Sequence, residues 1–186
     1  MQWILASASP RRRELLKEFI EEFEVIPARG EEKAEEGLAP DALVCALATQ
    51  KAEEVASLPE AQGKAVVGSD TVVVYDGEVL GKPKDEADAK RMLTALSGHT
   101  HQVYTGVCIA MPSGEKIIAA DCTDVEFEDL DEAAIAAYVA TGSPMDKAGA
   151  YGIQDGGVVK AIHGSYSNVV GFPCELFEKM LKSIKG

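Results

Sequence analysis

Three consecutive arginines, Arg11, Arg12 and Arg13, follow Ser9 and Pro10 near the start of the chain. Serine is a preferred helix N-cap and proline suits the first helical turn, so this segment is expected to begin a helix. Cations are unfavourable there, because the helix dipole places its positive end at the N-terminus. Backbone amides together with arginine side chains are typical of a phosphate site, and a bound anion would relieve the mismatch. The alternative is three solvated side chains.

A polar stretch, Gly68-Ser69-Asp70-Thr71, interrupts an apolar run in the expected strand at residues 65–75. In a regular strand Asp70 shares a face with Gly68, and Thr71 faces the other side. Gly68 leaves its face open to a ligand or to another backbone. A buried carboxylate is costly unless it is paired or holds a metal, so Asp70 is a candidate for chemistry; a turn aspartate bonded to local amides is the alternative. If Asp70 and Thr71 both contact a ligand, the strand must bend or end there.

Further charged residues could complete an anion site. Lys82 precedes a proline and is therefore held extended at an element boundary, where it could bind phosphate; a solvated lysine is the commoner case. Lys51 lies on an expected helix, and Glu31 and Glu32 lie in an acidic loop. Divalent cations bind nucleotides through one or two carboxylates plus the phosphates, so one of these glutamates with Asp70 could hold such an ion.

The glycine-rich segment 146–157 contains Gln154. A glutamine amide offers both a donor and an acceptor and could read the edge of a base, although an ordinary loop is an equal alternative. Four cysteines lie far apart without a C-x-x-C pair, which argues against a zinc or redox motif.

The composition is that of a globular protein. The chain has 186 residues, a net charge of −13 and 46% hydrophobic residues, so one domain with a real core is expected. The negative charge argues against binding to nucleic acid or to an anionic membrane. Without a long apolar run or a signal-peptide pattern, the expected location is the cytoplasm.

The pattern of apolar residues predicts alternating helices and strands, and hence a mixed sheet covered by helices. The expected strands lie near residues 2–6, 23–27, 65–83 (a hairpin), 101–111, 116–128 and 157–162. The expected helices lie at residues 10–20, 40–57, 85–98, 131–142 and 173–184.

Several segments together resemble the Maf family of nucleotide pyrophosphatases, in the expected order and over nearly the whole chain. They are LASASPRR, GSDTVVVYDGEVLGKP, LSGHTHQVYTGV, SPMDKAGAYGIQ and IHGSYSNVVGFP. The resemblance implies a single domain over residues 1–186, an α/β fold with a mixed twisted sheet, and two lobes around a cleft, akin to the inosine triphosphatase group. It also implies metal-dependent hydrolysis of a nucleoside triphosphate between the α and β phosphates.

The same resemblance implies the site residues and the substrate. It assigns Asp70 as proton acceptor, Lys82 as a second catalytic residue, and Asp70 with Glu31 as ligands of Mg²⁺ or Mn²⁺. Substrate binding is expected from Ser9, Arg12, Arg13 and Lys51. The combination of Arg11, Thr71 and Gln154 is similar to that of the branch acting on dTTP and UTP. The same chemistry on 7-methyl-GTP or CTP and a non-catalytic nucleotide-binding regulator of septum formation are the alternatives, and a homodimer is left open.

Overall fold

The computed structural model describes residues 1–185. The strands are β1 (Trp3–Leu5), β2 (Glu24–Val25), β3 (Ala65–Tyr75), β4 (Glu78–Leu80), β5 (Thr100–Ala110), β6 (Lys116–Phe127) and β7 (Val159–His163). They form one seven-stranded sheet in the order β2-β1-β3-β5-β6-β7, with β4 also paired to β3. β1 is parallel to β2 and β3, and the remaining pairs are antiparallel. The predicted mixed sheet is therefore confirmed.

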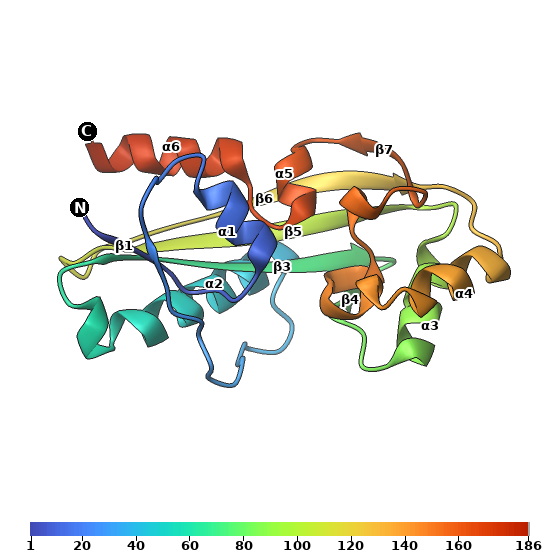
Figure 1. Ribbon diagram of the computed structural model, residues 1–186, viewed down its shortest axis with the longest axis horizontal. Coiled ribbons are helices and arrows are strands. Elements are labelled where there is room, and N and C mark those ends of the chain that lie inside the picture. The colour runs from blue at the N-terminus through green and yellow to red at the C-terminus, as the bar shows by residue number, and fades with distance from the viewer. Residues whose placement is uncertain (186) are drawn as a thin grey trace.

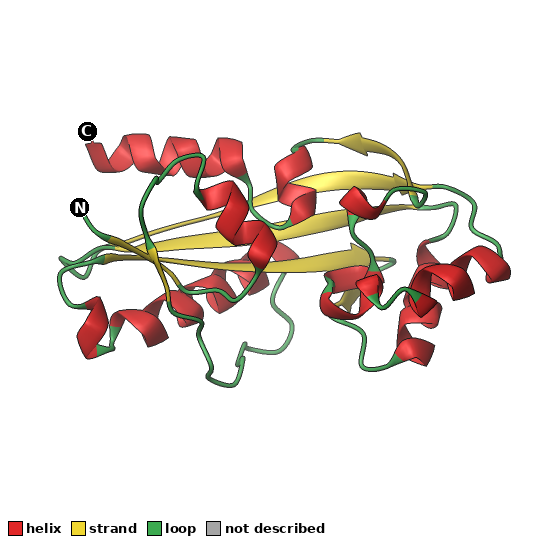
Figure 2. Ribbon diagram, viewed as in Figure 1, coloured by secondary structure: helices red, strands yellow, loops and turns green. Residues whose placement is uncertain are grey.

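Helices cover both faces of this sheet (Figures 1 and 2). They are α1 (Pro10–Leu16), α2 (Pro40–Ala56), α3 (Glu86–Leu96), α4 (Glu132–Ala140), α5 (Tyr166–Val170) and α6 (Cys174–Lys185), with short 3₁₀ helices η1 (Pro59–Ala61), η2 (Ser143–Asp146), η3 (Ala148–Ala150) and η4 (Ile153–Asp155). Figure 1 shows α2 on one face, α1 and α6 on the other, and α3 with α4 at the far end of the long strands. None of the helices in residues 1–185 combines the length and the apolar character needed to cross a bilayer.

The alternation of side chains along β3 divides the core between the two faces. Val67 packs with Leu5 and Phe177 on the side of α1 and α6, whereas Val66 packs with Ala48 of α2. A third cluster, which includes Val73 at the end of β3, gathers around α3 and α4. The long strands extend over most of the length of the molecule, and α3 and α4 lie beyond one end of them (Figures 1 and 2). The division of a single domain into two lobes stays a prediction.

Two glycines let α2 lie directly on the sheet. A Cβ atom on Gly68 would lie 2.2 Å from the carbonyl oxygen of Ala48, and one on Gly106 would lie 2.3 Å from that of Val44. No side chain fits in so little space, so the backbone of α2 contacts that of β3 and β5. The face that Gly68 leaves open is therefore occupied by a helix backbone, and Lys51 of α2 is brought close to the strand.

The structure differs from the predicted elements at two places. The first helix ends at Leu16 and not near Ile20, because the amides of Glu18 and Phe19 turn to carbonyls three residues back. Phe19 and Ile20 still pack into the core beside α6. Sequence periodicity also missed α5, whose five residues are too few for a helical pattern; its signal is the N-cap Ser165, which accepts from the Asn168 amide.

His101 of β5 is fully buried among aromatic rings. Its Nε2 lies 2.7 Å from the Tyr151 hydroxyl, and its ring packs edge-on against Phe127. Burial lowers the pKa of His101 to about 4, because the charged form would lose its water. Within residues 1–185 no three His, Cys, Asp or Glu side chains are placed to hold a metal ion, so His101 is a neutral core residue.

Acid is therefore expected to destabilise the protein through His101. Between pH 6.5 and about 4 the unfolded chain binds a proton that the folded chain does not, so the free energy of unfolding falls as the pH falls through this window. The full contribution is on the order of 3 kcal/mol. Urea denaturation of wild type and His101→Gln at pH 8 and pH 4.5 measures it: the pH dependence should be much weaker in the variant. His163→Gln, which changes an exposed histidine, should keep the wild-type dependence; an equal loss in both variants would contradict the assignment.

Candidate functional site

The centre of β3 is paired on one side only. β1 pairs with residues 65–67 of β3 and β4 pairs with residues 73–75, whereas β5 pairs with residues 66–74 along the other side. Residues 68–72 therefore form a gap in the sheet, which we call the β3 gap. Asp70 and Thr71 lie at its centre. β3 is continuous through both residues, and it is the neighbouring strands β1 and β4 that end on either side of them. Both residues line the cavity without the bend or end of β3 that was expected if both contact a ligand.

A cavity of about 570 Å³ opens at the β3 gap, a size typical of small-molecule sites. Because the gap connects the two faces of the sheet, the lining includes Lys51 from α2 on one side and Arg12 from α1 on the other. Lys82, after β4, and Gln154, in η4, also line it. The cavity thus brings together all of the predicted site residues except Arg13 and Glu31.

Arg12 is a half-buried cation that has no acidic hydrogen-bond partner among residues 1–185. Its Nε donates to the Gly171 carbonyl at 2.9 Å, and its terminal nitrogens donate to the hydroxyls of Thr71 at 3.0 Å and Ser7 at 3.4 Å. Burial lowers the pKa of Arg12, and the nearby charge of Asp70 offsets part of that effect. A guanidinium remains protonated in proteins, so Arg12 presents a positive charge that only neutral acceptors contact. Such a group is well suited to an anion.

The other two arginines have different surroundings. Arg11 reaches across the cavity to Asp146 of η2, with Nη1 and Oδ2 3.3 Å apart. Arg13 is exposed and does not line the cavity. The three cations after Pro10 thus have different surroundings. Arg11 is paired across the cavity, Arg12 lies half-buried in it, and Arg13 is exposed to solvent.

Asp70 is paired with Lys51 on the α2 side, and Lys51 is paired in turn with Glu32. Asp70 Oδ1 lies 2.6 Å from Lys51 Nζ, and the same Nζ lies 2.9 Å from Glu32 Oε1. Among residues 1–185, no group donates a hydrogen bond to Asp70 Oδ2. Asp70 is only 8% exposed, but it lines the cavity. Its free oxygen can therefore accept from a water molecule inside the cavity. Asp70 is therefore placed to orient or deprotonate that water.

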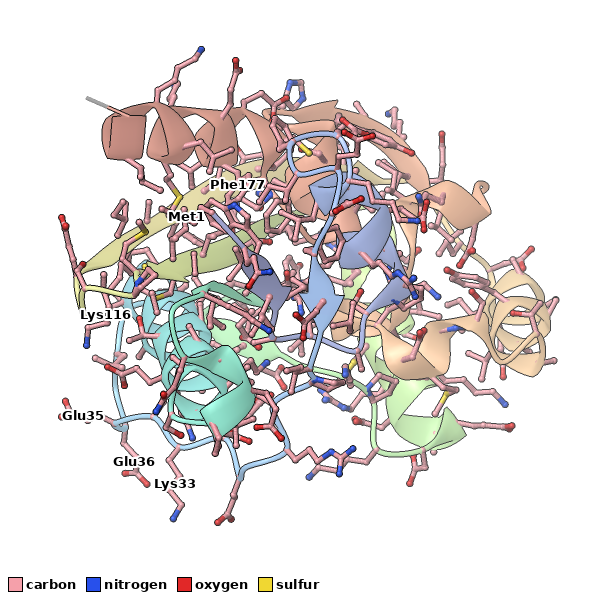
Figure 3. The ribbon with its side chains drawn as sticks, turned by 60° about the vertical axis from the view of Figure 1, so that its left-hand side comes forward. Met1, Lys33, Glu35, Glu36, Lys116 and Phe177 are labelled. Atoms are coloured by element: carbon pink, nitrogen blue, oxygen red, sulfur yellow. The ribbon has the colours of Figure 1, made fainter. Side chains whose placement is uncertain are left out.

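The acidic loop contributes Glu32 and not Glu31. Glu32 lines the cavity, whereas the Glu31 side chain is exposed and lies 3.7 Å from Lys33. Figure 3 shows Lys33, Glu35 and Glu36 extending from the same loop into solvent. Gln50 fixes the loop by donating to the Glu31 carbonyl and accepting from the Lys33 amide. The structure therefore places Glu32 at the cavity and the expected metal ligand Glu31 outside it. A run of like residues in a loop has no periodicity that would tell them apart.

These residues match a known family. A family profile described as Maf-like protein matches residues 2–184. The chain belongs to the Maf family. The dTTP/UTP pyrophosphatase of Thermococcus gammatolerans is 51% identical over 179 residues, covering 95% of this chain and 94% of that protein. That of Agathobacter rectalis is 48% identical, covering 97% of each chain. The solved nucleoside-triphosphatase / dITP/XTP pyrophosphatase of Mycobacterium abscessus is 18% identical, with a TM-score of 0.45, and covers 70% of this chain and 76% of that one.

The remaining predicted residues of this Maf protein lie where they could contact a ligand. Ser9 is the N-cap of α1, as expected, and its hydroxyl accepts from the Arg12 amide. Lys82 and Gln154 are exposed at the rim of the cavity. Among residues 1–185, neither side chain forms a hydrogen bond or an ion pair. Both are therefore free to bind a molecule that enters.

Sequence reasoning missed a network that shapes the Gln154 loop. Asp155 accepts from the hydroxyls of Tyr138 at 2.6 Å and Ser143 at 2.7 Å. Lys147 donates to the Ser143 carbonyl at 2.6 Å and to Asp146 at 3.0 Å. Burial raises the pKa of Asp146, but the bond from Lys147 and the charges of Lys147 and Arg11 outweigh it, and the net shift is downward. The charged residues within the glycine-rich segment were the sequence signal from which this network could have been predicted.

Proposed function

We propose that this Maf protein hydrolyses dTTP and UTP to the nucleoside monophosphate and pyrophosphate. One observation carries the proposal: the β3 gap brings an anion-binding arginine, Arg12, and a carboxylate with a free oxygen, Asp70, into the same cavity. The relatives are named dTTP/UTP pyrophosphatases, and the alignments cover nearly all of both chains, which supports the choice of substrate.

The residues suggest how the reaction is carried out. Asp70 Oδ2 accepts the proton of a water that attacks the α-phosphorus in line with the departing pyrophosphate. Arg12, Lys51 and Lys82 are placed to neutralise charge on the phosphates and on the leaving group, a contribution that is mainly electrostatic. Glu32 helps to hold Lys51 beside Asp70.

A divalent cation, Mg²⁺ or Mn²⁺, fits the same carboxylates. Both Asp70 and Glu32 contact one nitrogen, Lys51 Nζ, so their oxygens converge, and carboxylate oxygens suit hard cations. Two carboxylates are few for a protein-only site, which agrees with a cation that arrives with the phosphates. When bound, such a cation would polarise the phosphoryl oxygens and lower the pKa of a bound water.

The base is expected to lie toward Arg11 and Gln154. A pyrimidine with a 2,4-dioxo edge presents one N–H between two acceptors, and the free Gln154 amide can both donate and accept. Arg11, held by Asp146, can supply a further donor to a carbonyl group of the base.

A nucleotide panel tests the proposal. Purified protein is incubated with Mg²⁺ or Mn²⁺ and dTTP, UTP, CTP, dATP, GTP or 7-methyl-GTP, and the products are identified by chromatography. We expect dTMP or UMP with pyrophosphate, and no orthophosphate. Faster turnover of 7-methyl-GTP or CTP would overturn the assigned substrate. If dTTP binds but is never cleaved with either metal, the enzymatic proposal fails and a nucleotide-binding regulator is favoured.

The neighbouring glutamates provide a matched pair for the cation. Glu32→Gln is expected to raise the Mg²⁺ concentration for half-maximal activity about tenfold, because loss of a coordinating or supporting group costs about 10- to 100-fold in metal affinity. Glu31→Gln should leave the titration unchanged, since its side chain is outside the cavity. Equal effects of the two variants would refute the choice of Glu32 over Glu31.

A further inference from the structure

A chain of hydrogen bonds leads from Arg12 into the core. Arg12 Nη2 lies 3.0 Å from Thr71 Oγ1, which in turn lies 2.9 Å from Thr105 Oγ1. Thr105 Oγ1 lies 3.3 Å from the carbonyl oxygen of Asn168 in α5. Thr71 and Thr105 are directly opposite each other on β3 and β5, so the sheet register itself aligns the two hydroxyls.

The chemistry of the two ends fixes the direction of these bonds. A guanidinium can only donate, so Thr71 Oγ1 accepts from Arg12. A carbonyl oxygen can only accept, so Thr105 donates to Asn168. The Thr71 hydrogen is then directed to Thr105. The other acceptor within reach of Thr71, the Gly171 carbonyl, is 3.5 Å away and also belongs to the protein. With either acceptor, the Thr71 hydroxyl hydrogen is engaged by a group of the protein.

We propose that Thr105 is a positioning residue for the phosphate-binding Arg12, acting through Thr71. Thr105 is fully buried and contacts nothing in the cavity, so it acts only by fixing the Thr71 hydroxyl as an acceptor. With its hydrogen engaged by a protein acceptor, Thr71 affects the binding of the phosphates through Arg12. This inference rests on the proposed function, in which Arg12 binds the triphosphate.

The end of α5 provides a second contact that holds Arg12 in place. Arg12 Nε donates to Gly171, at the end of α5. Asn168 ties α5 to the sheet, because its buried Nδ2 donates to the Val103 carbonyl at 3.0 Å and to Thr123 Oγ1 at 2.9 Å. The guanidinium is therefore held between β3 and α5, and Thr105 bridges the two.

Variants at the two threonines of this chain of hydrogen bonds test the proposal. Thr105→Val is expected to raise the KM for dTTP about tenfold with little change in kcat, the size of losing about one hydrogen bond to a charged group. The dissociation constant of inorganic tripolyphosphate, measured by calorimetry, should rise by the same factor. Thr105→Ser, which keeps the hydroxyl, should restore both values. Thr71→Val should raise the KM and the dissociation constant as much as Thr105→Val does. The double variant should raise them no further, because both substitutions break the same chain of hydrogen bonds.

Thr123→Val is the matched control. Thr123 is equally buried and also contacts Asn168 and the backbone of α5, but it does not lie between Arg12 and the core. Asn168 Nδ2 keeps the Val103 carbonyl as an acceptor in this variant, so α5 stays attached to the sheet. The variant should lose stability while keeping wild-type tripolyphosphate affinity. If Thr123→Val weakens binding as much as Thr105→Val, or if Thr105→Ser does not restore it, the positioning role is refuted. The dissociation constant of tripolyphosphate measures anion binding by Arg12 directly. The result of this test therefore does not depend on whether dTTP is the substrate.

Discussion

Asp70→Asn is expected to lower kcat for pyrophosphate release by about 10²- to 10⁴-fold, the usual contribution of a general base. The amide keeps the shape of the carboxylate but cannot take a proton from the attacking water. Lys51 retains Glu32 as a partner at 2.9 Å, so no unpaired buried cation remains and the fold should persist. The measurement is pyrophosphate release under single-turnover conditions, together with dTTP affinity by calorimetry in the absence of turnover.

Affinity separates this role from a structural one. Asp70→Asn should still bind dTTP, because the phosphate-binding side chains are unchanged. Asp124→Asn, an exposed carboxylate on β6 that accepts from Gln102, is the control and should be as active as wild type. Wild-type kcat in Asp70→Asn would remove Asp70 from the reaction.

Arg12→Ala is expected to lower kcat/KM for dTTP by at least about 10²-fold, because hydrogen bonds to charged groups contribute about 1.5–3 kcal/mol each. Arg12 is placed to give the phosphates both a positive charge and N–H donors in a fixed geometry. Arg12→Lys should recover only part of the loss, since an ammonium cannot reach the acceptors at Gly171 and Thr71 while also binding phosphate. Steady-state kinetics with dTTP measure both effects.

The neighbouring arginine is the control for charge. Arg13→Ala removes the same charge one residue away, from an exposed side chain outside the cavity. Its kcat/KM should stay within about twofold of wild type, as expected for a solvated surface charge. If both substitutions reduced the affinity for dTTP equally, the cause would be the loss of positive charge near the N-terminus of α1 and not the geometry of Arg12.

The sequence predicted the sheet and the longer helices from their apolar residues together with the proline, aspartate and glycine residues at their boundaries. It also placed Arg12, Lys51, Asp70 and Lys82 at one site, through the resemblance to the Maf family. It could not assign different surroundings to three adjacent arginines, because their burial depends on α5 and on the loop of η2, which are distant in the chain. Nor could it choose Glu32 over Glu31, since that choice depends on where Lys51 meets Asp70.

The expectation about β3 did not consider that a strand can be open along one side. It assumed that a ligand meets one face of a strand, so that Asp70 and Thr71 could share it only if the strand were distorted. The register of β1 and β4 opens the side of β3 instead, and strand ends are poorly defined by sequence.

The β3 gap also constrains any inhibitor of this protein. Peptide groups on the open side of residues 68–72 have no neighbouring strand, so water or a guest molecule must satisfy them. A compound that displaces this water gains affinity only if it offers the same hydrogen bonds in return. An effective inhibitor therefore needs a polar edge that lies along the strand, and a mimic of the anionic tail alone would leave that hydration in place.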